Sequence, residues 1–248
     1  QRLKCAVLVA VSAVCLSGCN SNQFNMDGIT GGALTMFQGA TLSDEQLNKL
    51  SADSAHQSDT ENELAAAGSP YDQRLQHIAR YINIPNRPLT FKVYLTDQVN
   101  AFALPNGEVR VFSGLMDKMN DQELLFILGH EAGHVVHKHA HKEMQLAYAA
   151  SGARQIAASN MGQVGQLAAS ELGELTEAFV NAQFSQSQEE QSDDYGAALL
   201  RTYRLDPKVG ATALRKLASG RSDIISQMFS SHPDPEDRAK RIELAGKA

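Results

Sequence analysis

Apolar residues recur every three or four positions in several separate segments of this chain. This spacing is typical of helices that bury one face. Capping residues and breakers mark the expected ends of these helices, and Pro85, for example, should stop the second one. Together, apolar spacing and end signals predict helices over residues 71–84, 120–136, 175–203, a segment that begins at 206, and 235–244, and the start signal at 43–46 predicts a polar helix over residues 43–67.

Apolar and polar residues instead alternate over residues 89–96, which predicts a β-strand. Two shorter strands are expected at residues 100–104 and 109–112, on either side of a turn formed by Pro105-Asn106-Gly107. The pattern therefore predicts one small β-sheet within a predominantly helical chain, which is an α+β fold.

The helix predicted over residues 120–136 differs from the others because it is apolar nearly all round. Asn120 and Glu123 have the spacing of a capping box at its start. A helix of this composition is expected to be buried on every side. Residues 149–174, by contrast, are rich in Ala, Gly, Ser and Gln, and we expect a loosely packed helical hairpin there.

The N-terminal residues have the pattern of an export signal. Arg2 and Lys4 precede an apolar run of 12 residues (5–16). This run is shorter than the roughly 20 residues that a membrane-spanning helix needs. It ends in the sequence LSGC at residues 16–19, which resembles the bacterial lipobox, where the chain is cut before the cysteine and Cys19 is acylated. A soluble secreted protein with a chance cysteine near its cleavage site is the alternative.

This interpretation divides the chain into a signal peptide (1–18), a lipidated Cys19 with a flexible tether (19–42), and one folded domain (43–248). All three cysteines lie at or before position 19, so no disulfide is expected in the domain. Asn20 follows the lipidated residue. By resemblance to lipoprotein sorting, a residue other than Asp at this position indicates the outer membrane, with the protein facing the periplasm.

The amino-acid composition agrees with a folded domain and adds little to these predictions. The chain is 43% hydrophobic and 20% charged, as expected of an ordinary globular protein. Its formal net charge is −6 and no basic stripe is present, so a nucleic-acid partner is not expected.

The strongest chemical signal is an HExxH motif, His130-Glu131-Ala132-Gly133-His134, inside the apolar helix. Histidines four residues apart project from one helix face and can share a metal ion, with Glu131 beside it to accept a proton from water. The motif could also arise by chance on a solvated helix. In an apolar helix, however, burying these side chains without a metal would be costly. We predict one zinc ion per chain, held by His130, His134 and a third ligand.

The third ligand defines the class of enzyme. A metzincin would have Gly at position 137 and His at position 140, but this chain has His137 and Ala140, so that class is excluded. The remaining candidates are two i, i+4 acidic pairs in a later helical segment, namely Glu189 with Asp193 and Glu190 with Asp194. A solvated acidic face is the alternative for either pair, and spacing alone does not choose between them.

Several features of the chain, in their order, resemble the HtpX and CAAX-prenyl-protease group of zinc metallopeptidases. The resemblance extends from about residue 42 onward. It rests on HEAGH at 130–134, His139, Asn100-Ala101-Phe102-Ala103, Gly114-Leu115-Met116, Glu189-x-x-x-Asp193, His232-Pro233 and Arg238. It implies a zincin-like domain with the small sheet packed against the HExxH helix. It also implies Glu189 as the third zinc ligand, with Asp193 accepting a hydrogen bond from a zinc-binding histidine. Ser192 stands where the family usually has Ala, which exchanges one small residue for another.

Four other histidines are further candidates. His232 could donate to the transition-state oxyanion, cover the zinc in a latent form, or merely lead into the last helix, with Arg238 anchoring it. His139 matches a family position and is a candidate contact of a zinc ligand. His137 and His141 are interpreted as solvated or locally bonded residues beyond the buried part of the helix.

The resemblance further implies a substrate-binding strand that contains Asn100, Ala101, Phe102 and Ala103. An extended peptide would add to the sheet there as another strand, although an ordinary core strand is the alternative.

We therefore expect a zinc-dependent endopeptidase in which Glu131 is the general base. Binding through the backbone favours extended chains, so unfolded or misassembled envelope proteins are the expected substrates. A periplasmic chaperone or assembly scaffold that retains a zinc site is the alternative from another class. A protease for prenylated substrates is disfavoured, because the sequence has no transmembrane helices that would build the chamber of such enzymes.

Overall fold

A computed structural model describes residues 42–159, 171–181, 183–219, 231–232 and 234–245 of the chain. The predicted signal peptide and nearly all of the predicted tether lie outside these residues, as does the middle of the predicted hairpin (160–170). Among the helices that the structure describes, none combines the length and the apolar character needed to cross a membrane.

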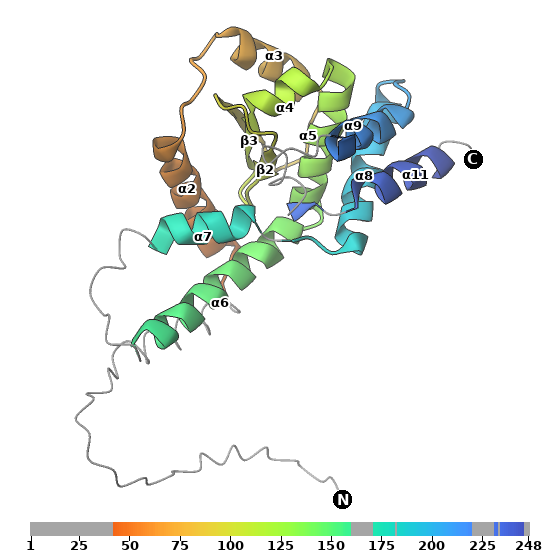
Figure 1. Ribbon diagram of the computed structural model, residues 1–248. Coiled ribbons are helices and arrows are strands. Elements are labelled where there is room, and N and C mark those ends of the chain that lie inside the picture. The colour runs from red at the N-terminus through yellow and green to blue at the C-terminus, as the bar shows by residue number, and fades with distance from the viewer. Residues whose placement is uncertain (1–41, 160–170, 182, 220–230, 233, 246–248) are drawn as a thin grey trace, which may run out of the picture.

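The described part of the chain is mainly helical, with one small sheet (Figure 1). Its elements in chain order are α2 (Asp44–Glu61), α3 (Pro70–Ala79), β1 (Thr90–Tyr94), β2 (Ala101–Ala103), β3 (Glu108–Phe112), α4 (Ser113–Lys118), α5 (Asp121–Val136), α6 (His139–Ser159), α7 (Glu171–Val180), α8 (Gln186–Thr202), α9 (Lys208–Ser219) and α11 (Pro235–Ala245). The predicted fold class is confirmed.

The sheet has the strand order β1-β3-β2. Strands β1 and β3 are parallel, with Thr90 opposite Glu108, whereas β2 and β3 are antiparallel, with Ala101 opposite Val111. The predicted turn between β2 and β3 is present, and Gly107 adopts a φ of 90° there, a conformation that glycine tolerates best. In this order β2 is an edge strand, which leaves one side of its backbone without a strand partner in the described part of the protein.

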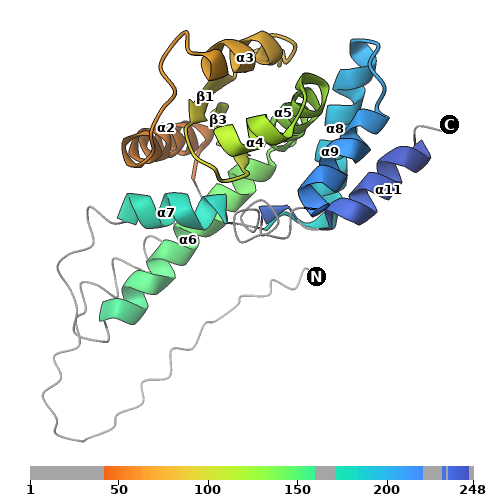
Figure 2. The ribbon, with the colours of Figure 1, turned by 45° about the horizontal axis from the view of Figure 1, so that its top comes forward.

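Helix α5 lies between the sheet on one side and α8, α9 and α11 on the other (Figures 1 and 2). Side chains of β2 alternate between two apolar clusters. Ala101 and Ala103 belong to the cluster around α5, whereas Phe102 belongs to a second cluster formed with α2, α6 and α7. The sheet therefore separates two cores, and α5 fills the larger one, as its uniformly apolar composition predicted.

Glycines allow α5 and α8 to touch backbone to backbone. A Cβ on Gly133 would lie 2.8 Å from the Cα of Ser192, and a Cβ on Gly129 would lie 3.1 Å from the Cα of Gly196. Such short distances leave no room for a larger residue. This close crossing brings the acidic face of α8 against the HExxH motif.

A buried ion-pair network joins α2 to the sheet. The fully buried guanidinium of Arg110 donates to both carboxylate oxygens of Asp59, at 2.7 and 3.0 Å, and pairs with Glu108 at 2.6 Å. Lys92 also pairs with Asp59, at 2.7 Å. Arg110 is thus fully paired although it lies inside the protein.

Two predicted helices end differently in the structure. Helix α2 stops at Glu61 rather than near 67, because the next residues pair with β1: the amide of Ala65 donates to the carbonyl of Val93 at 2.9 Å. The single helix predicted over 175–203 is wrong. Helix α7 ends at Val180, and α8 begins after Ser185, whose hydroxyl caps the amide of Gln188.

Helices α3 and α4 also differ from the prediction, in smaller ways. Helix α3 ends at Ala79, a little before the predicted end at 84, and the short helix α4 between β3 and α5 was not predicted. Helix α6 begins at His139, ten residues before the predicted hairpin. The three strands, α5, α9 and α11 lie close to their predicted positions.

Candidate metal centre

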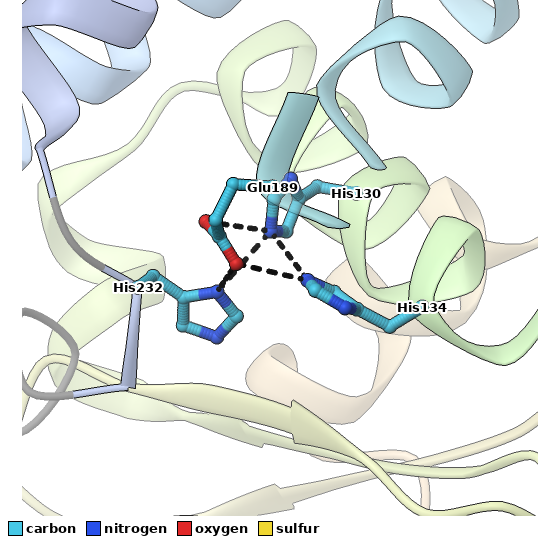
Figure 3. Close-up of side chains that lie close together, drawn as sticks. All are labelled: His130, His134, Glu189 and His232. Carbon is cyan, nitrogen blue, oxygen red and sulfur yellow. Dashed lines mark hydrogen bonds and ion pairs between the residues drawn. The ribbon is translucent and has the colours of Figure 1, made fainter. Parts of the chain in front are cut away.

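Helix α5 presents His130 and His134 on one face. Asn120 and Glu123 form the predicted capping box at the start of this helix. The HExxH motif lies in its last turns, which are buried. The two imidazoles point their Nε2 atoms toward a common centre, and these atoms lie 3.0 Å apart (Figure 3).

Helix α8 contributes Glu189 from the opposite side. One carboxylate oxygen of Glu189, Oε1, lies 3.3 Å from Nε2 of His134, and the other, Oε2, lies 3.6 Å from Nε2 of His130. The neighbouring acid, Glu190, instead accepts a hydrogen bond from Gln186 at 3.0 Å on the outer side of α8. Of the two acidic pairs that spacing left open, the structure turns the one containing Glu189 toward the histidines.

Asp193, one turn after Glu189, contacts the far side of the His130 ring. Its Oδ1 accepts a hydrogen bond from Nδ1 of His130 at 2.9 Å. Arg238 of α11 holds this carboxylate through two further hydrogen bonds of 2.6 and 2.9 Å, and it also pairs with Glu189. Burial acts to raise the pKa of Asp193, but the hydrogen bonds and charge of Arg238, together with the hydrogen bond from His130, outweigh it and lower the pKa to about 2. Asp193 is therefore a carboxylate at neutral pH. Because it can only accept there, Nδ1 of His130 carries the proton and Nε2 is left with a lone pair.

A metal ion fits this set of donor atoms. Atoms of His130, His134, Glu189 and His232 all lie within 4.8 Å of one another, and all four residues are buried. Burial lowers the pKa of His134 well below its ordinary value, which favours the neutral imidazole that binds metals. Oε2 of Glu189 is buried and makes no properly directed hydrogen bond to any described residue, although it pairs with Arg238. Two imidazole nitrogens and one carboxylate are a usual ligand set of catalytic zinc.

Glu131 lies beside this cluster. Its Oε1 is buried, has no hydrogen-bond partner among the described residues, and lies 3.8 Å from Nε2 of His232. Burial raises the pKa of the Glu131 carboxyl above its ordinary value. A buried carboxyl group with one oxygen that accepts no hydrogen bond is suited to exchange a proton with a molecule that enters the site.

His232 approaches from the segment that precedes α11. Its Nδ1 lies 3.0 Å from Oε1 of Glu189 and 3.2 Å from Nε2 of His130, so it stands at the fourth corner of the cluster (Figure 3). The sequence did not distinguish an anchoring role from a role at the site, and the structure brings His232 to the ligands.

Phe184 is a contact of the site to which sequence reasoning assigned no role. Its ring centroid lies 3.8 Å from that of His134 and 5.3 Å from that of His232. Its amide donates to the carbonyl of Ser231 at 3.2 Å, which ties the segment before α8 to the segment that carries His232. A buried aromatic residue directly before the helix cap Ser185 was the available signal.

The other histidines differ in position. His137 is exposed, as predicted, whereas His141 is buried against Asp44 on α2 and does not join the cluster. The expectation that His141 lies beyond the buried part is therefore wrong, because α6 folds back over α2. His139 is buried against the ring of His134, with the two Nδ1 atoms 3.2 Å apart.

The predicted substrate strand is the edge strand β2, which packs near α5. Ala101, Phe102 and Ala103 are buried. Asn100 precedes the strand. Its Oδ1 accepts from the amide of Ala101 at 2.9 Å, but its buried Nδ2 has no partner in the described structure. The strand is thus both an edge and a packed core element, so the two interpretations of the sequence are compatible.

Comparison with known proteins agrees with this chemistry. The model of peptidase family M48 matches residues 69–245. Metalloprotease LoiP of Escherichia coli (strain K12) is 43% identical over 240 residues, which cover 96% of this chain and 94% of the relative. Metalloprotease YcaL of the same organism is 36% identical over 245 residues, or 98% of this chain and 96% of the relative.

A more distant relative is longer than this chain. The Beta-barrel assembly-enhancing protease of Yersinia pestis is 28% identical over 173 residues, which cover 63% of this chain and 34% of that protein. The match to the family model and the two full-length relatives together establish that the chain belongs to peptidase family M48, whose members are zinc metallopeptidases.

Proposed function

We propose that this protein is a zinc-dependent endopeptidase of the bacterial cell envelope that cleaves unfolded or misassembled proteins, with Glu131 as its general base. The observation that carries the proposal is the meeting of His130, His134 and Glu189 around one buried centre, with a Glu131 carboxylate oxygen beside it that accepts no hydrogen bond from any described residue. These groups come from two helices, and their convergence at one buried point places nitrogen and oxygen donor atoms where a metal ion could bind them together.

The ligand set would be His130, His134 and Glu189. When bound there, zinc supplies Lewis acidity, which makes both a peptide carbonyl and a water molecule more reactive. Asp193 holds the ring of His130 so that Nε2 faces the centre, and Arg238 holds Asp193. These contacts set the ligands in place before a substrate arrives.

Glu131 would move the proton. Its carboxylate accepts a proton from the attacking water, and the water oxygen then bonds to the carbonyl carbon. When the C–N bond breaks, Glu131 returns the proton to the leaving amine, so the residue is regenerated. Its buried position and raised pKa support both acceptance and return.

His232 would assist the same step. Nε2 of His232 faces Glu131, and Nδ1 lies at the corner of the cluster left by the three proposed ligands. An imidazole in this position can donate a hydrogen bond to the oxyanion that forms on the peptide carbonyl. The alternative role of His232 is to cover the zinc site in a latent form of the enzyme. In that case His232 must move before a substrate can bind.

The edge strand β2 supports peptide substrates in extended form. A peptide that pairs with its free side would be held by backbone hydrogen bonds, which do not depend on side-chain identity. Asn100 adds a buried Nδ2 that lacks an acceptor and could donate to a peptide carbonyl. Such binding selects chains that are locally unfolded, because a folded protein already uses its backbone groups.

The envelope location is inferred from residues 1–20. The lipobox-like sequence at 16–19 with Asn20 after it supports a lipid anchor on Cys19 at the outer membrane, facing the periplasm. The name of the Yersinia pestis relative, which refers to β-barrel assembly, supports envelope proteins as substrates.

The central test uses Glu131→Gln. The variant should retain one zinc per chain and the wild-type unfolding temperature but should no longer cleave unfolded casein. Glu190→Gln, on the outer side of α8, is the matched control and should cleave normally. An active Glu131→Gln variant would refute the role of Glu131. Zinc-loaded wild-type protein that binds casein without cutting it would favour the scaffold alternative.

The location is tested separately through Cys19. Wild-type protein in bacterial cells should incorporate radiolabelled palmitate and sediment with outer membranes. Cys19→Ser should incorporate no palmitate and should not appear as a lipid-anchored outer-membrane protein. Unchanged membrane association and labelling of Cys19→Ser would contradict the anchor.

A further inference from the structure

His139, the first residue of α6, connects the metal centre to α8. Its Nδ1 lies 3.2 Å from Nδ1 of His134, and its Nε2 lies 3.0 Å from Oε1 of Gln191. The residue is only 6% exposed. It therefore stands between a proposed zinc ligand and a hydrogen-bond acceptor on a different helix.

The turn between α5 and α6 makes this contact possible. Lys138 adopts a φ of 59°, a left-handed conformation that is uncommon for residues other than glycine. The amides of His137 and Lys138 close the end of α5 by donating to the carbonyls of Gly133 and Val135. The chain then reverses sharply enough for His139 to lie against the ring of His134 five residues earlier.

The hydrogen bonds determine where the protons are. Oε1 of Gln191 can only accept, so Nε2 of His139 is the donor in that contact. A neutral His139 then has a lone pair on Nδ1, and Nδ1 of His134, at 3.2 Å, is the nearest donor to it; the hydroxyl of Ser192 lies farther away, at 3.5 Å. His134 is consequently left with a lone pair on Nε2, the atom that lies 3.0 Å from Nε2 of His130 and 3.3 Å from Oε1 of Glu189.

We propose that His139 is a positioning residue that fixes the tautomer and orientation of His134 for zinc binding. The two proposed histidine ligands are then held in different ways. His130 donates to the carboxylate of Asp193. Nδ1 of His134 has no carboxylate partner in the described structure and donates to Nδ1 of a neutral His139, whose Nε2 donates in turn to Gln191. The proposal rests on the proposed function in one respect, that His134 is a zinc ligand.

The role depends on one acceptor atom, which permits a matched pair of variants. In His139→Asn, the side-chain Oδ1 stands near the place of Nδ1 and can still accept from His134. His139→Leu has a similar size but no acceptor. Loss of a hydrogen-bond partner of a metal-binding histidine typically weakens metal affinity by about 10–100-fold. We therefore expect such a loss for His139→Leu and a much smaller one for His139→Asn.

The measurement is the zinc dissociation constant of the detergent-solubilised full-length protein, determined by competition with a chromophoric chelator. The visible absorption spectrum of the cobalt-substituted protein gives a second readout, because it responds to the orientation of the ligands. His141→Leu, a buried histidine of the same helix outside the cluster, is the control and should bind zinc as the wild type does. Circular dichroism of the zinc-free variants shows whether each one folds.

The tautomers can also be observed without any substitution. Nitrogen-15 chemical shifts of labelled histidines in the zinc-loaded protein should show a proton on Nδ1 of His134 and on Nε2 of His139. The reverse assignment for His139 would overturn the proposal even if a variant failed to fold.

These measurements distinguish failure of the proposed function from failure of the proposed role of His139. If the wild type takes up no zinc, the proposed function fails and this proposal fails with it. If the wild type binds zinc and His139→Leu binds it equally well, only the positioning role is refuted. Equal weakening in folded His139→Asn and His139→Leu would show that His139 acts through packing, and this too would refute the proposed role.

Discussion

Gly133 of α5 and Ser192 of α8 lie so close that a Cβ on the glycine would be 2.8 Å from the Cα of the serine. Gly133 lies between His130 and His134 along α5, and Ser192 lies between Glu189 and Asp193 along α8. The separation of the two backbones thus decides whether Glu189 can reach the histidines. A glycine in the HExxH motif therefore contributes to the geometry of the site although it carries no functional group.

Gly133→Ala should separate the helices. Overpacking of a tight core contact costs about 1–3 kcal/mol, and we expect a loss of unfolding free energy in this range together with weaker zinc binding. Urea denaturation and metal analysis measure the two effects. Thr212→Ala, on the exposed side of α9, should change stability by less than about 0.5 kcal/mol. Unchanged stability and zinc affinity in Gly133→Ala would show that α8 can shift without consequence.

Glu189→Ala and Glu190→Ala distinguish the two acidic registers. Glu189 is buried among the histidines, whereas Glu190 bonds to Gln186 on the outer side of the helix. Zinc content after dialysis should fall to near zero for Glu189→Ala and remain at one per chain for Glu190→Ala. The opposite result would move the ligand by one residue.

His232→Ala tests how this histidine acts. A residue that donates to the oxyanion is worth about 10²–10³-fold in kcat, so we expect a loss of this size with zinc retained. The assay is steady-state cleavage of an unfolded protein, with the exposed His137→Ala as the control. An increase in activity would instead mean that His232 blocks the site in the resting enzyme.

The buried Asp59–Arg110 pair predicts how stability depends on pH. Burial acts to raise the pKa of Asp59, but the hydrogen bonds from Arg110, Lys92 and Tyr94, together with the charge of Arg110, outweigh it and hold the pKa below its ordinary value of 3.8. A carboxyl with a lowered pKa stabilises the folded state above its unfolded pKa, and this contribution is lost as the pH falls through the folded pKa. The wild type should therefore lose stability more steeply than Asp59→Asn below about pH 4.

At neutral pH, Asp59→Asn should cost about 1–3 kcal/mol, because it leaves the buried guanidinium with fewer charged partners. Melting temperatures across a pH series measure both effects. Asp53→Asn removes an exposed i, i+4 pair with Lys49 from the same helix and should change stability by less than about 1 kcal/mol. If the melting temperatures of the wild type and Asp59→Asn changed with pH in parallel, Asp59 would not be the source of the pH dependence.

Local patterns predicted most of the elements. The strands and helix α5 were recognised because alternation, apolar periodicity and the Asn120–Glu123 cap all act within a few residues. The same reasoning missed the break between α7 and α8 and the early end of α2. In the second case the deciding interaction is non-local, since Ala65 pairs with Val93 of the sheet.

The expected chemistry could be read from the residues alone. HExxH on an apolar helix indicates a metal with a base beside it, because the spacing of two histidines on a helix is a local property. The packing of the helices, by contrast, shows which carboxylate faces the histidines, that His232 joins the cluster, and that His139 contacts His134. Glu189 and Glu190 are equivalent in spacing and differ only in the side of α8 that packs on α5. That choice is made by the contact of Gly133 with Ser192, between residues far apart in the chain.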